Sequence, residues 1–264
     1  MGTEYECRPE SLAETEKRLQ KNGFICDVKV LSETDSTNRV AKELAMCGAP
    51  EGTLVVAQKQ SNGRGRLGRS FFSPEGGIYM SMVLRPQISA QKALSVTTCA
   101  AVATARAIDR VCGCRSGIKW VNDIFVSGKK VCGILAEAGL SGGSETPDYV
   151  VLGIGINVKK QSVPAELEGI VGCLEEVVAG TVEKDVLIGA VWEEFSELYR
   201  NLSTAVYMEE YKERSILMGR EVSVLAEEGP YRAVVTDIDK EGHLVILREG
   251  RKEILSAGEV SVRL

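Results

Sequence analysis

Residues 60–69 combine flexible backbone with fixed positive charge more densely than any other part of the chain. The segment reads Gln-Ser-Asn-Gly-Arg-Gly-Arg-Leu-Gly-Arg, so three glycines alternate with three arginines within seven residues. Glycine lets a backbone approach a ligand closely, and arginine presents a planar charged fork that matches carboxylate and phosphate oxygens. The pattern predicts a loop that wraps an anion after an apolar strand over residues 53–59.

Two other interpretations of this arginine–glycine loop are weaker. The run matches Gly-x-Gly-x-x-Gly, the dinucleotide-binding fingerprint, which requires a helix to open at the third glycine. Here Pro74 and the pair Gly76-Gly77 follow, and they forbid a regular helix. Arg-Gly repeats bind RNA, but this chain has one copy and no interleaved aromatic residues. The anion-binding interpretation is therefore preferred.

A second polar cluster lies between two apolar runs. Residues 119–133 read Lys-Trp-Val-Asn-Asp-Ile-Phe-Val-Ser-Gly-Lys-Lys-Val-Cys-Gly, and the Ser-Gly pair predicts a hairpin. A hairpin does not account for the polar side chains before its first strand, which are Lys119, Trp120, Asn122 and Asp123. An indole, an amide and a carboxylate together suit a nucleotide, by stacking, hydrogen bonding and proximity to phosphate or metal.

The strand after this turn is expected at the centre of a sheet. Residues 131–136 are apolar at every position, which predicts a strand covered on both faces. The charge of a lysine at the end of such a strand interacts strongly with an anion, because the lysine is partly desolvated. Alternation leaves open whether Lys129 or Lys130 points inward.

Composition and charge limit the class of protein. The chain has 264 residues, of which 44% are hydrophobic and 26% charged, as in ordinary globular proteins. A net charge of -5 argues against a dedicated nucleic-acid binder. The N-terminus has no signal-peptide core, and no run approaches the ~18 apolar residues of a membrane span. One histidine and eight scattered cysteines leave little material for a zinc site. We expect a cytoplasmic protein with neither membrane nor nucleic acid as a partner.

The rest of the chain predicts an α+β unit followed by a small all-β unit. Asp35-Ser-Thr-Asn38 forms either a simple helix cap or a polar clamp at the helix that follows. At Gly219 the sequence pattern changes from mixed helices and strands to short strands in which apolar and polar residues alternate. The predicted helices cover residues 9–22, 39–46, 89–112 and 183–214, and the predicted strands cover 27–31, 53–59, 78–84, several runs within 117–158, and then 221–225, 232–236, 244–247 and 259–263.

Taken together, the arginine–glycine loop and the 119–133 run resemble the biotin protein ligases, also called biotin–[acetyl-CoA-carboxylase] ligases. The resemblance extends from about Val30 to the C-terminus and includes residues 35–38, Gly-Ile-Gly-Ile-Asn at 153–157 and the ending 258–263. It implies an α+β fold, with a catalytic domain related to class II aminoacyl-tRNA synthetases and to biotin/lipoate ligases, and a C-terminal SH3-like β-barrel. The expected divisions are an N-terminal extension over 1–27, the catalytic domain over 28–217 and the SH3-like domain over 218–264. Because 35 residues precede Ser36, we expect the monofunctional type, without the DNA-binding domain of many bacterial relatives.

The resemblance also implies a reaction and its residues. ATP would convert biotin to biotinyl-5′-AMP, and a lysine of a biotin carboxyl carrier protein would then take the biotinyl group. The catalytic residues implied are Lys130, Arg66 and Asp123. The biotin-binding residues implied are Ser36, Thr37, Asn38, Gln60, Gly63, Arg64, Gly65, Arg66, Lys130 and Gly133. The ATP-binding residues implied are Arg69, Trp120, Asn122 and Asn157. Mg²⁺ is expected with ATP, although no carboxylate pair identifies its ligands, and a homodimer is possible.

Two other functions compete with this one. A lipoate–protein ligase shares the fold, but that family typically carries Arg-Arg-x-Ser-Gly-Gly-Gly in place of the arginine–glycine loop, and this chain lacks it. A catalytically silent biotin sensor or repressor is opposed by the short N-terminal segment, by the acidic charge balance and by the presence of Arg66, Asp123 and Lys130.

Overall fold

The computed structural model describes residues 25–89, 93–140, 145–178, 180–226, 229–256 and 259–261, with backbone alone at 93 and 259–261. The helix expected over 9–22 lies outside the described residues, as does most of the expected N-terminal extension. No helix in these ranges has the length and apolar character needed to cross a membrane.

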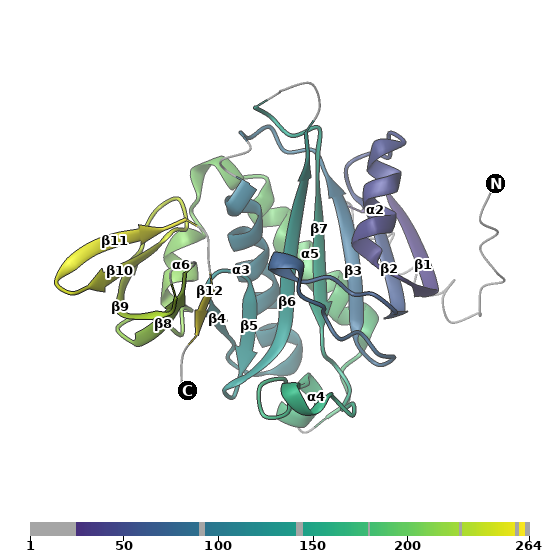
Figure 1. Cartoon of the computed structure of the whole chain (residues 1–264). Coiled ribbons are helices and arrows are strands. Elements are labelled where there is room, and N and C mark those ends of the chain that lie inside the picture. The colour runs from purple at the N-terminus through teal and green to yellow at the C-terminus, as the bar shows by residue number, and fades with distance from the viewer. Residues whose placement is uncertain are drawn as a thin grey trace.

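A seven-stranded mixed sheet forms the larger part of the molecule (Figure 1). Its strand order is β1-β2-β3-β7-β6-β5-β4. The strands are β1 (Asp27–Thr34), β2 (Thr53–Gln60), β3 (Ile78–Leu84), β4 (Gly117–Lys119), β5 (Asp123–Val126), β6 (Lys129–Gly139) and β7 (Tyr149–Ile156). β1 and β2 are parallel, and the other neighbouring pairs are antiparallel. The expected strands are confirmed, and so is the hairpin expected at Ser127-Gly128, which joins the antiparallel strands β5 and β6.

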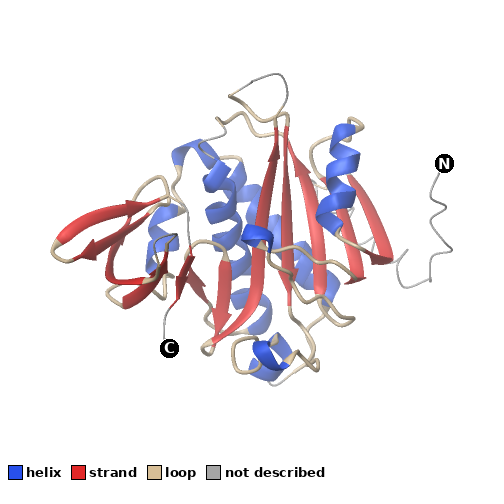
Figure 2. Ribbon diagram, in the orientation of Figure 1, coloured by secondary structure: helices blue, strands red, loops and turns tan. Residues whose placement is uncertain are grey.

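Helices cover the two faces of this sheet unequally. α3 (Ala93–Cys112) packs on β4, β5 and β6, and α5 (Lys184–Tyr199) packs beside α3. On the opposite face α2 (Thr37–Met46) packs on β2, β3 and β7. Figures 1 and 2 show α2 in front of the sheet and α3 and α5 behind it. Alternate strand residues therefore enter two cores, with Val55, Val83 and Val151 facing α2 and their neighbours facing α3 and α5.

Among the described residues, no α-helix packs over the front of β6. The loop that follows β2 crosses there instead, drawn in dark blue in Figure 1. The expected central position of this strand is confirmed, because β6 lies between β7 and β5; α3 covers one face, and on the other face Phe71 of the loop lies against Gly133 beside a cavity. Gly133 and Leu135 line this cavity, although they are as apolar as residues of a core.

The segment expected to be helical over 183–214 is helical for most of its length, but it is not one continuous helix. The segment divides into α5, a short 3₁₀ turn η4 (Leu202–Thr204) and α6 (Met208–Glu213). Ala205 has a left-handed φ of 51°, which a continuous right-handed helix cannot contain. The break turns α6 so that the Tyr207 hydroxyl donates to Ser95 O at 2.9 Å. Val186, in the first turn of α5, is 53% exposed.

The C-terminal unit is a five-stranded antiparallel sheet of order β11-β10-β9-β8-β12. Its strands are β8 (Glu221–Leu225), β9 (Tyr231–Ile238), β10 (Leu244–Arg248), β11 (Arg251–Leu255) and β12 (Glu259–Ser261). The expected change to an all-β unit is confirmed. Strand β11 was missed because its sequence begins with three charged residues, and it is created by a two-residue hairpin at Glu249-Gly250, where φ is 49° and 78°.

Candidate active site

A cavity of about 780 Å³ opens on the α2 face of the large sheet, between β6, β7 and the arginine–glycine loop. Small-molecule sites have volumes of roughly 300–1,000 Å³. Its wall is completed by residues 157–176, which contain the 3₁₀ turn η3 (Ala165–Leu167) and α4 (Leu174–Val177). Of the site residues expected from the sequence, only Gly63 does not line this cavity. The fold therefore brings residues 36–38, 60–69, 119–133 and 157 to one place.

The arginine–glycine loop is an ordered miniature hairpin. Gly65 N–H donates to Arg69 O at 2.7 Å, and Phe71 N–H donates to Gly63 O at 2.8 Å. At the tip, the 3₁₀ turn η1 (Arg66–Gly68) includes Leu67 at a left-handed φ of 54°. Arg66 Nη1 donates to Asn122 Oδ1 at 3.3 Å, so the loop reaches the connection between β4 and β5.

Gly63 holds this loop together from outside the cavity. A Cβ atom there would lie 2.3 Å from Phe71 O and 2.4 Å from Ser73 Oγ. No side chain fits at such distances, so the loop closes as it does only with glycine at this position. The structure thus gives Gly63 a place in the packing of the loop and not on the cavity wall.

Two glycines that face each other across neighbouring strands form part of the cavity floor. Gly133 of β6 is the register partner of Gly155 of β7. A Cβ atom would lie 3.0 Å from the Phe71 ring at Gly133 and 2.5 Å from it at Gly155. The Phe71 ring also meets the Tyr79 ring edge-on, with centroids 6.4 Å apart. Sequence reasoning assigned no role to Phe71, and the only available signal was the two-residue spacing of Gly153 and Gly155, which puts them on one face of a strand.

Residues 36–38 form a polar clamp. Ser36 is the N-cap residue of α2, yet its side chain makes no capping hydrogen bond. Thr37 N–H donates to Gln60 Oε1 at 2.8 Å, and Gln60 Nε2 donates to Ser73 Oγ at 2.9 Å. The open choice between a simple cap and a clamp is thereby decided, because these side chains connect α2 to β2 and to the loop.

The clamp extends through residues that sequence reasoning missed. Ser81 Oγ lies 2.6 Å from Asn38 Oδ1 and 2.8 Å from Thr37 Oγ1. Asn38 Nδ2 donates to Glu137 Oε2 at 2.8 Å. A Cβ atom at Gly153 would lie 2.0 Å from Asn38 Oδ1, so the glycine makes room for the amide. No sequence signal identified Ser81 or Glu137, because each belongs to an ordinary strand.

The two adjacent lysines separate in the structure. Lys130 Nζ lies 2.7 Å from Asp123 Oδ1, with side chains 26% and 21% exposed. The Lys130 backbone is fixed on one side, where its N–H donates to Ile170 O and its carbonyl accepts from Gly172 N–H, both at 2.9 Å. The exposed Lys129 side chain lies over Gly172, where a Cβ atom would come within 2.7 Å of it. Lys130 is therefore the lysine that forms an ion pair with Asp123.

Trp120 connects the cavity to the C-terminal sheet. The side chain is 5% exposed, and its Nε1 donates to Gly242 O at 2.9 Å. The next residue is held as well, because the Tyr211 hydroxyl donates to Val121 O at 2.9 Å. The connection between β4 and β5 is thus supported from behind by α6 and by the β9–β10 turn.

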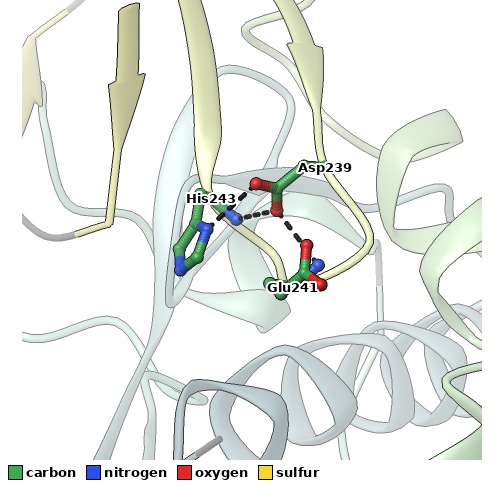
Figure 3. Close-up of side chains that lie close together, drawn as sticks. All are labelled: Asp239, Glu241 and His243. Carbon is green, nitrogen blue, oxygen red and sulfur yellow. Dashed lines mark hydrogen bonds and ion pairs between the residues drawn. The ribbon is translucent and has the colours of Figure 1, made fainter. Parts of the chain in front are cut away.

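That turn contains the chain's histidine, grouped with two carboxylates (Figure 3). Asp239 Oδ1 accepts from the N–H groups of Glu241 and His243 at 3.0 and 2.8 Å. His243 Nδ1 lies 2.9 Å from Asp239 Oδ2. These hydrogen bonds close the β9–β10 turn and present the Gly242 carbonyl to Trp120. The geometry of the turn therefore explains why Asp239, Glu241 and His243 lie together.

The cavity contains cations but no activated nucleophile. Burial raises the pKa of the Tyr79 phenol, whose hydroxyl donates to Pro74 O at 2.7 Å. Burial likewise raises the pKa of the Cys132 thiol beneath the floor. Burial, and then the nearby charge of Lys159, lowers the pKa of Lys184, whose Nζ lies 3.5 Å from Gly77 O. The site can therefore position and neutralise anions, and catalysis by a thiolate or phenolate is not expected there.

Comparison with known proteins places this fold and site in one class. Residues 30–157 match the model of the Biotin/lipoate A/B protein ligase family, and residues 217–263 match the Biotin protein ligase C terminal domain. The structure is similar to that of "Biotin protein ligase from Aquifex aeolicus in complex with biotin and ATP", with a TM-score of 0.76, 28% identity, and coverage of 90% of this chain and 99% of that one.

Relatives in sequence agree. The chain is 36% identical over 262 residues to "Bifunctional ligase/repressor BirA" of Bacillus spizizenii, covering 95% of this chain and 79% of the relative. It is 38% identical over 232 residues to the protein of the same name from Bacillus subtilis, covering 84% and 70%. The chain belongs to the biotin protein ligase family.

Proposed function

We propose that this protein activates biotin with ATP and transfers the biotinyl group to a lysine of a biotin carboxyl carrier protein. The observation that supports this most strongly is the single cavity that unites the polar clamp, the arginine–glycine loop and the Lys130–Asp123 pair. A pocket with neutral hydrogen-bonding groups at one end and cations at the other suits a ligand with a polar neutral head and a reacting carboxylate.

In the first step, a biotin carboxylate oxygen attacks the α-phosphorus of ATP, and the bond to the β-phosphate oxygen breaks. The products are biotinyl-5′-AMP and pyrophosphate. Both reactants are anions, so the barrier is lowered mainly by positioning and by nearby positive charge. Lys130 and Arg66 carry this charge in our proposal, with Asp123 orienting the Lys130 ammonium.

We assign the other expected site residues to different parts of the cavity. At the clamp, Ser36, Thr37, Asn38 and Gln60 bind the biotin head, and Gly133 lets the ligand lie close to β6. Arg64 and Gly65 belong to the loop that covers the activated carboxyl. Arg69, Asn122 and Asn157 are proposed for the nucleotide, with Trp120 acting through the connection that it holds. A covering loop protects the acyl-adenylate from water.

In the second step, the neutral amine of the carrier lysine attacks the acyl carbon of the adenylate. An amide forms, AMP leaves with the bonding electrons, and the amine loses a proton. The loop must admit this lysine, which agrees with the exposure of Arg64 and Arg69 at its outer edge. We further propose residues 28–217 as the catalytic domain and 218–264 as the SH3-like domain.

Mg²⁺ is proposed as part of MgATP. Such ions usually keep several waters and bind one or two carboxylates together with the phosphates. The carboxylates that line the cavity are Asp123, Glu168 and Glu176, and two of them are paired already, Asp123 with Lys130 at 2.7 Å and Glu176 with Lys160 at 2.9 Å, so we assign no ligand to the ion. When bound, the ion would neutralise phosphate charge during the first step.

Pyrophosphate exchange into ATP tests the first step directly. We expect exchange that depends on biotin and MgATP, and mass spectrometry should then show one biotinyl group on a carrier domain. Lipoate is the matched alternative substrate, because its ligases share the fold. Exchange with lipoate and none with biotin would refute the proposal, and exchange with neither would favour a binding protein.

A further inference from the structure

Glu137 of β6 forms the far end of the clamp network. Its Oε2 accepts from Asn38 Nδ2 at 2.8 Å, and its Oε1 lies 3.9 Å from Arg64 Nη1. We infer that Glu137 is a positioning residue, whose carboxylate fixes the direction of the hydrogen bonds along the biotin-binding clamp. The inference rests on the proposed biotin ligase function and adds a specificity determinant that does not line the cavity.

The direction follows from the donors and acceptors available. A carboxylate offers only acceptors, so Asn38 must turn its NH₂ group toward Glu137 and its Oδ1 toward Ser81. Ser81 has one hydroxyl proton, and the 2.6 Å contact with Asn38 Oδ1 requires it, since two bare acceptors would repel at that distance. The Ser81 hydroxyl also lies 2.8 Å from Thr37 Oγ1, and Thr37 Oγ1 lies 3.1 Å from Gln60 Oε1, so the single Thr37 proton has two acceptors within the network, Ser81 and Gln60.

The other end of the network imposes the same direction. Thr37 N–H can only donate, so Gln60 turns its Oε1 toward Thr37 and its NH₂ toward Ser73. Ser73 Oγ then donates to Phe71 O at 2.8 Å. The backbone N–H of Thr37 thus fixes the Gln60 amide at this end, and Glu137 fixes the Asn38 amide at the other.

This arrangement selects for a ligand group. Because its proton is taken within the network, by Ser81 or by Gln60, the Thr37 hydroxyl offers the cavity acceptor lone pairs alone. It therefore favours a ligand that donates a hydrogen there, as the N–H of a cyclic urea does. A dithiolane ring has no such donor.

Arg64 explains why a carboxylate, and not an amide, is needed at position 137. A glutamine would have to direct its NH₂ group toward either Asn38 or Arg64, and both of these side chains are donors in the present arrangement. If the glutamine NH₂ group faces Asn38, the Asn38 amide must rotate, and the direction of the hydrogen bonds along the clamp reverses. If it faces Arg64, two donors face each other. The substitution changes volume little, so its effect isolates hydrogen-bond direction.

The first test compares Glu137→Gln with Glu33→Gln. Glu33 of β1 makes an exposed ion pair with Lys59 and lies outside the cavity lining, so it controls for the loss of a surface carboxylate. We expect Glu137→Gln to raise the KM for biotin about tenfold, the effect of losing one hydrogen bond to a charged group. The kcat, the KM for ATP and the Tm should stay close to those of the control. A lowered Tm with an unchanged KM for biotin would overturn the inference.

The second test exchanges the two functional groups. Asn38→Asp alone sets two carboxylates against each other, and we expect biotin binding, measured by calorimetry, to weaken strongly. In the double variant Asn38→Asp/Glu137→Gln an amide again faces a carboxylate, and Ser81 can still donate to position 38. Binding should recover at least about tenfold relative to Asn38→Asp, which again corresponds to one such hydrogen bond. No recovery would overturn the inference. A wild-type protein without biotin-dependent exchange would instead refute the proposed function.

Discussion

The two ends of the cavity are organised in different ways. At the clamp, Thr37 and Asn38 are 3% and 5% exposed, and their polar atoms are joined in a continuous hydrogen-bond network. At the cationic end, Arg69 and Lys129 are exposed, and the Lys130–Asp123 pair is half-buried. The clamp is preorganised for a neutral head, whereas the cationic end gathers charge that an anionic ligand can draw inward.

This difference suggests which substitutions should affect affinity and which should affect rate. Preorganised contacts bind the ground state and the transition state alike, so their loss raises KM. Charges that approach a reacting phosphate stabilise the transition state more than the ground state, so their loss lowers kcat. The following predictions use that contrast.

The largest effect is expected at Lys130. Lys130→Ala should lower the rate of adenylate formation at least about 100-fold, as does loss of one electrostatic donor at a reacting oxyanion. Single-turnover formation of biotinyl-5′-AMP measures it. Lys129→Ala is the matched control, because that side chain lies over Gly172, and its rate should fall by less than about threefold. Equal losses at the two lysines would remove the distinction drawn between them.

A methyl group under the clamp should instead weaken biotin binding. At Gly153→Ala the new Cβ would lie 2.0 Å from Asn38 Oδ1, so the amide must move and its bonds to Ser81 and Glu137 are strained. The KM for biotin should rise at least about tenfold, with a smaller change in kcat.

Gly189→Ala provides the control for that substitution. Gly189 lies in α5 with no atom within 4 Å of its would-be Cβ, and alanine there should stabilise the protein by about 0.5–1 kcal/mol. Unchanged biotin kinetics in Gly153→Ala would show that the clamp is not rigid.

The loop tip should control how long the intermediate is retained. Arg66→Gly removes the hydrogen bond to Asn122 and makes the loop backbone more flexible. Biotinyl-5′-AMP should therefore dissociate about tenfold faster. Stopped-flow release and biotinylation of bystander lysines both report this. Arg66→Lys keeps the charge without the planar fork and should be intermediate. An unchanged release rate would mean that the loop does not cover the adenylate.

The smallest effect is expected where the C-terminal sheet meets the cavity wall. Trp120→Phe removes the donor to Gly242 O, and we expect the free energy of unfolding to fall by about 1 kcal/mol beyond its packing effect. The KM for ATP should rise a few-fold, because the connection that holds Asn122 is loosened.

The other tryptophan supplies a matched control. Trp192 is fully buried in α5, and its Nε1 has no hydrogen-bond partner among the residues that the structure describes. Trp192→Phe therefore loses the same volume without losing a hydrogen bond. If chemical denaturation gives equal losses for the two variants, the Trp120 bond contributes nothing to stability.

Much of the fold and site was predictable because it is encoded locally. Strand β3 matches its predicted bounds, since a run of seven residues that is apolar except for Ser81 ends at turn signals on both sides. The arginine–glycine loop was predicted from residue types alone, because only glycine allows such close packing and only arginine carries a permanent planar charge. The motifs of the resemblance supplied the remaining residues, which line one cavity except for Gly63.

Tertiary structure decided what depends on contacts between distant segments. The sequence could not show that Gly133 faces Gly155, because strand register is set by pairing across the sheet. Neither could it identify Glu137, which meets Asn38 from 99 residues away, or direct the Trp120 indole to Gly242. The break at Ala205 likewise arises because burying Tyr207 and Tyr211 outweighs local helix propensity. Residue chemistry thus determined which groups are present, and packing of the sheet against α2, α3 and the C-terminal turn determined which of them meet.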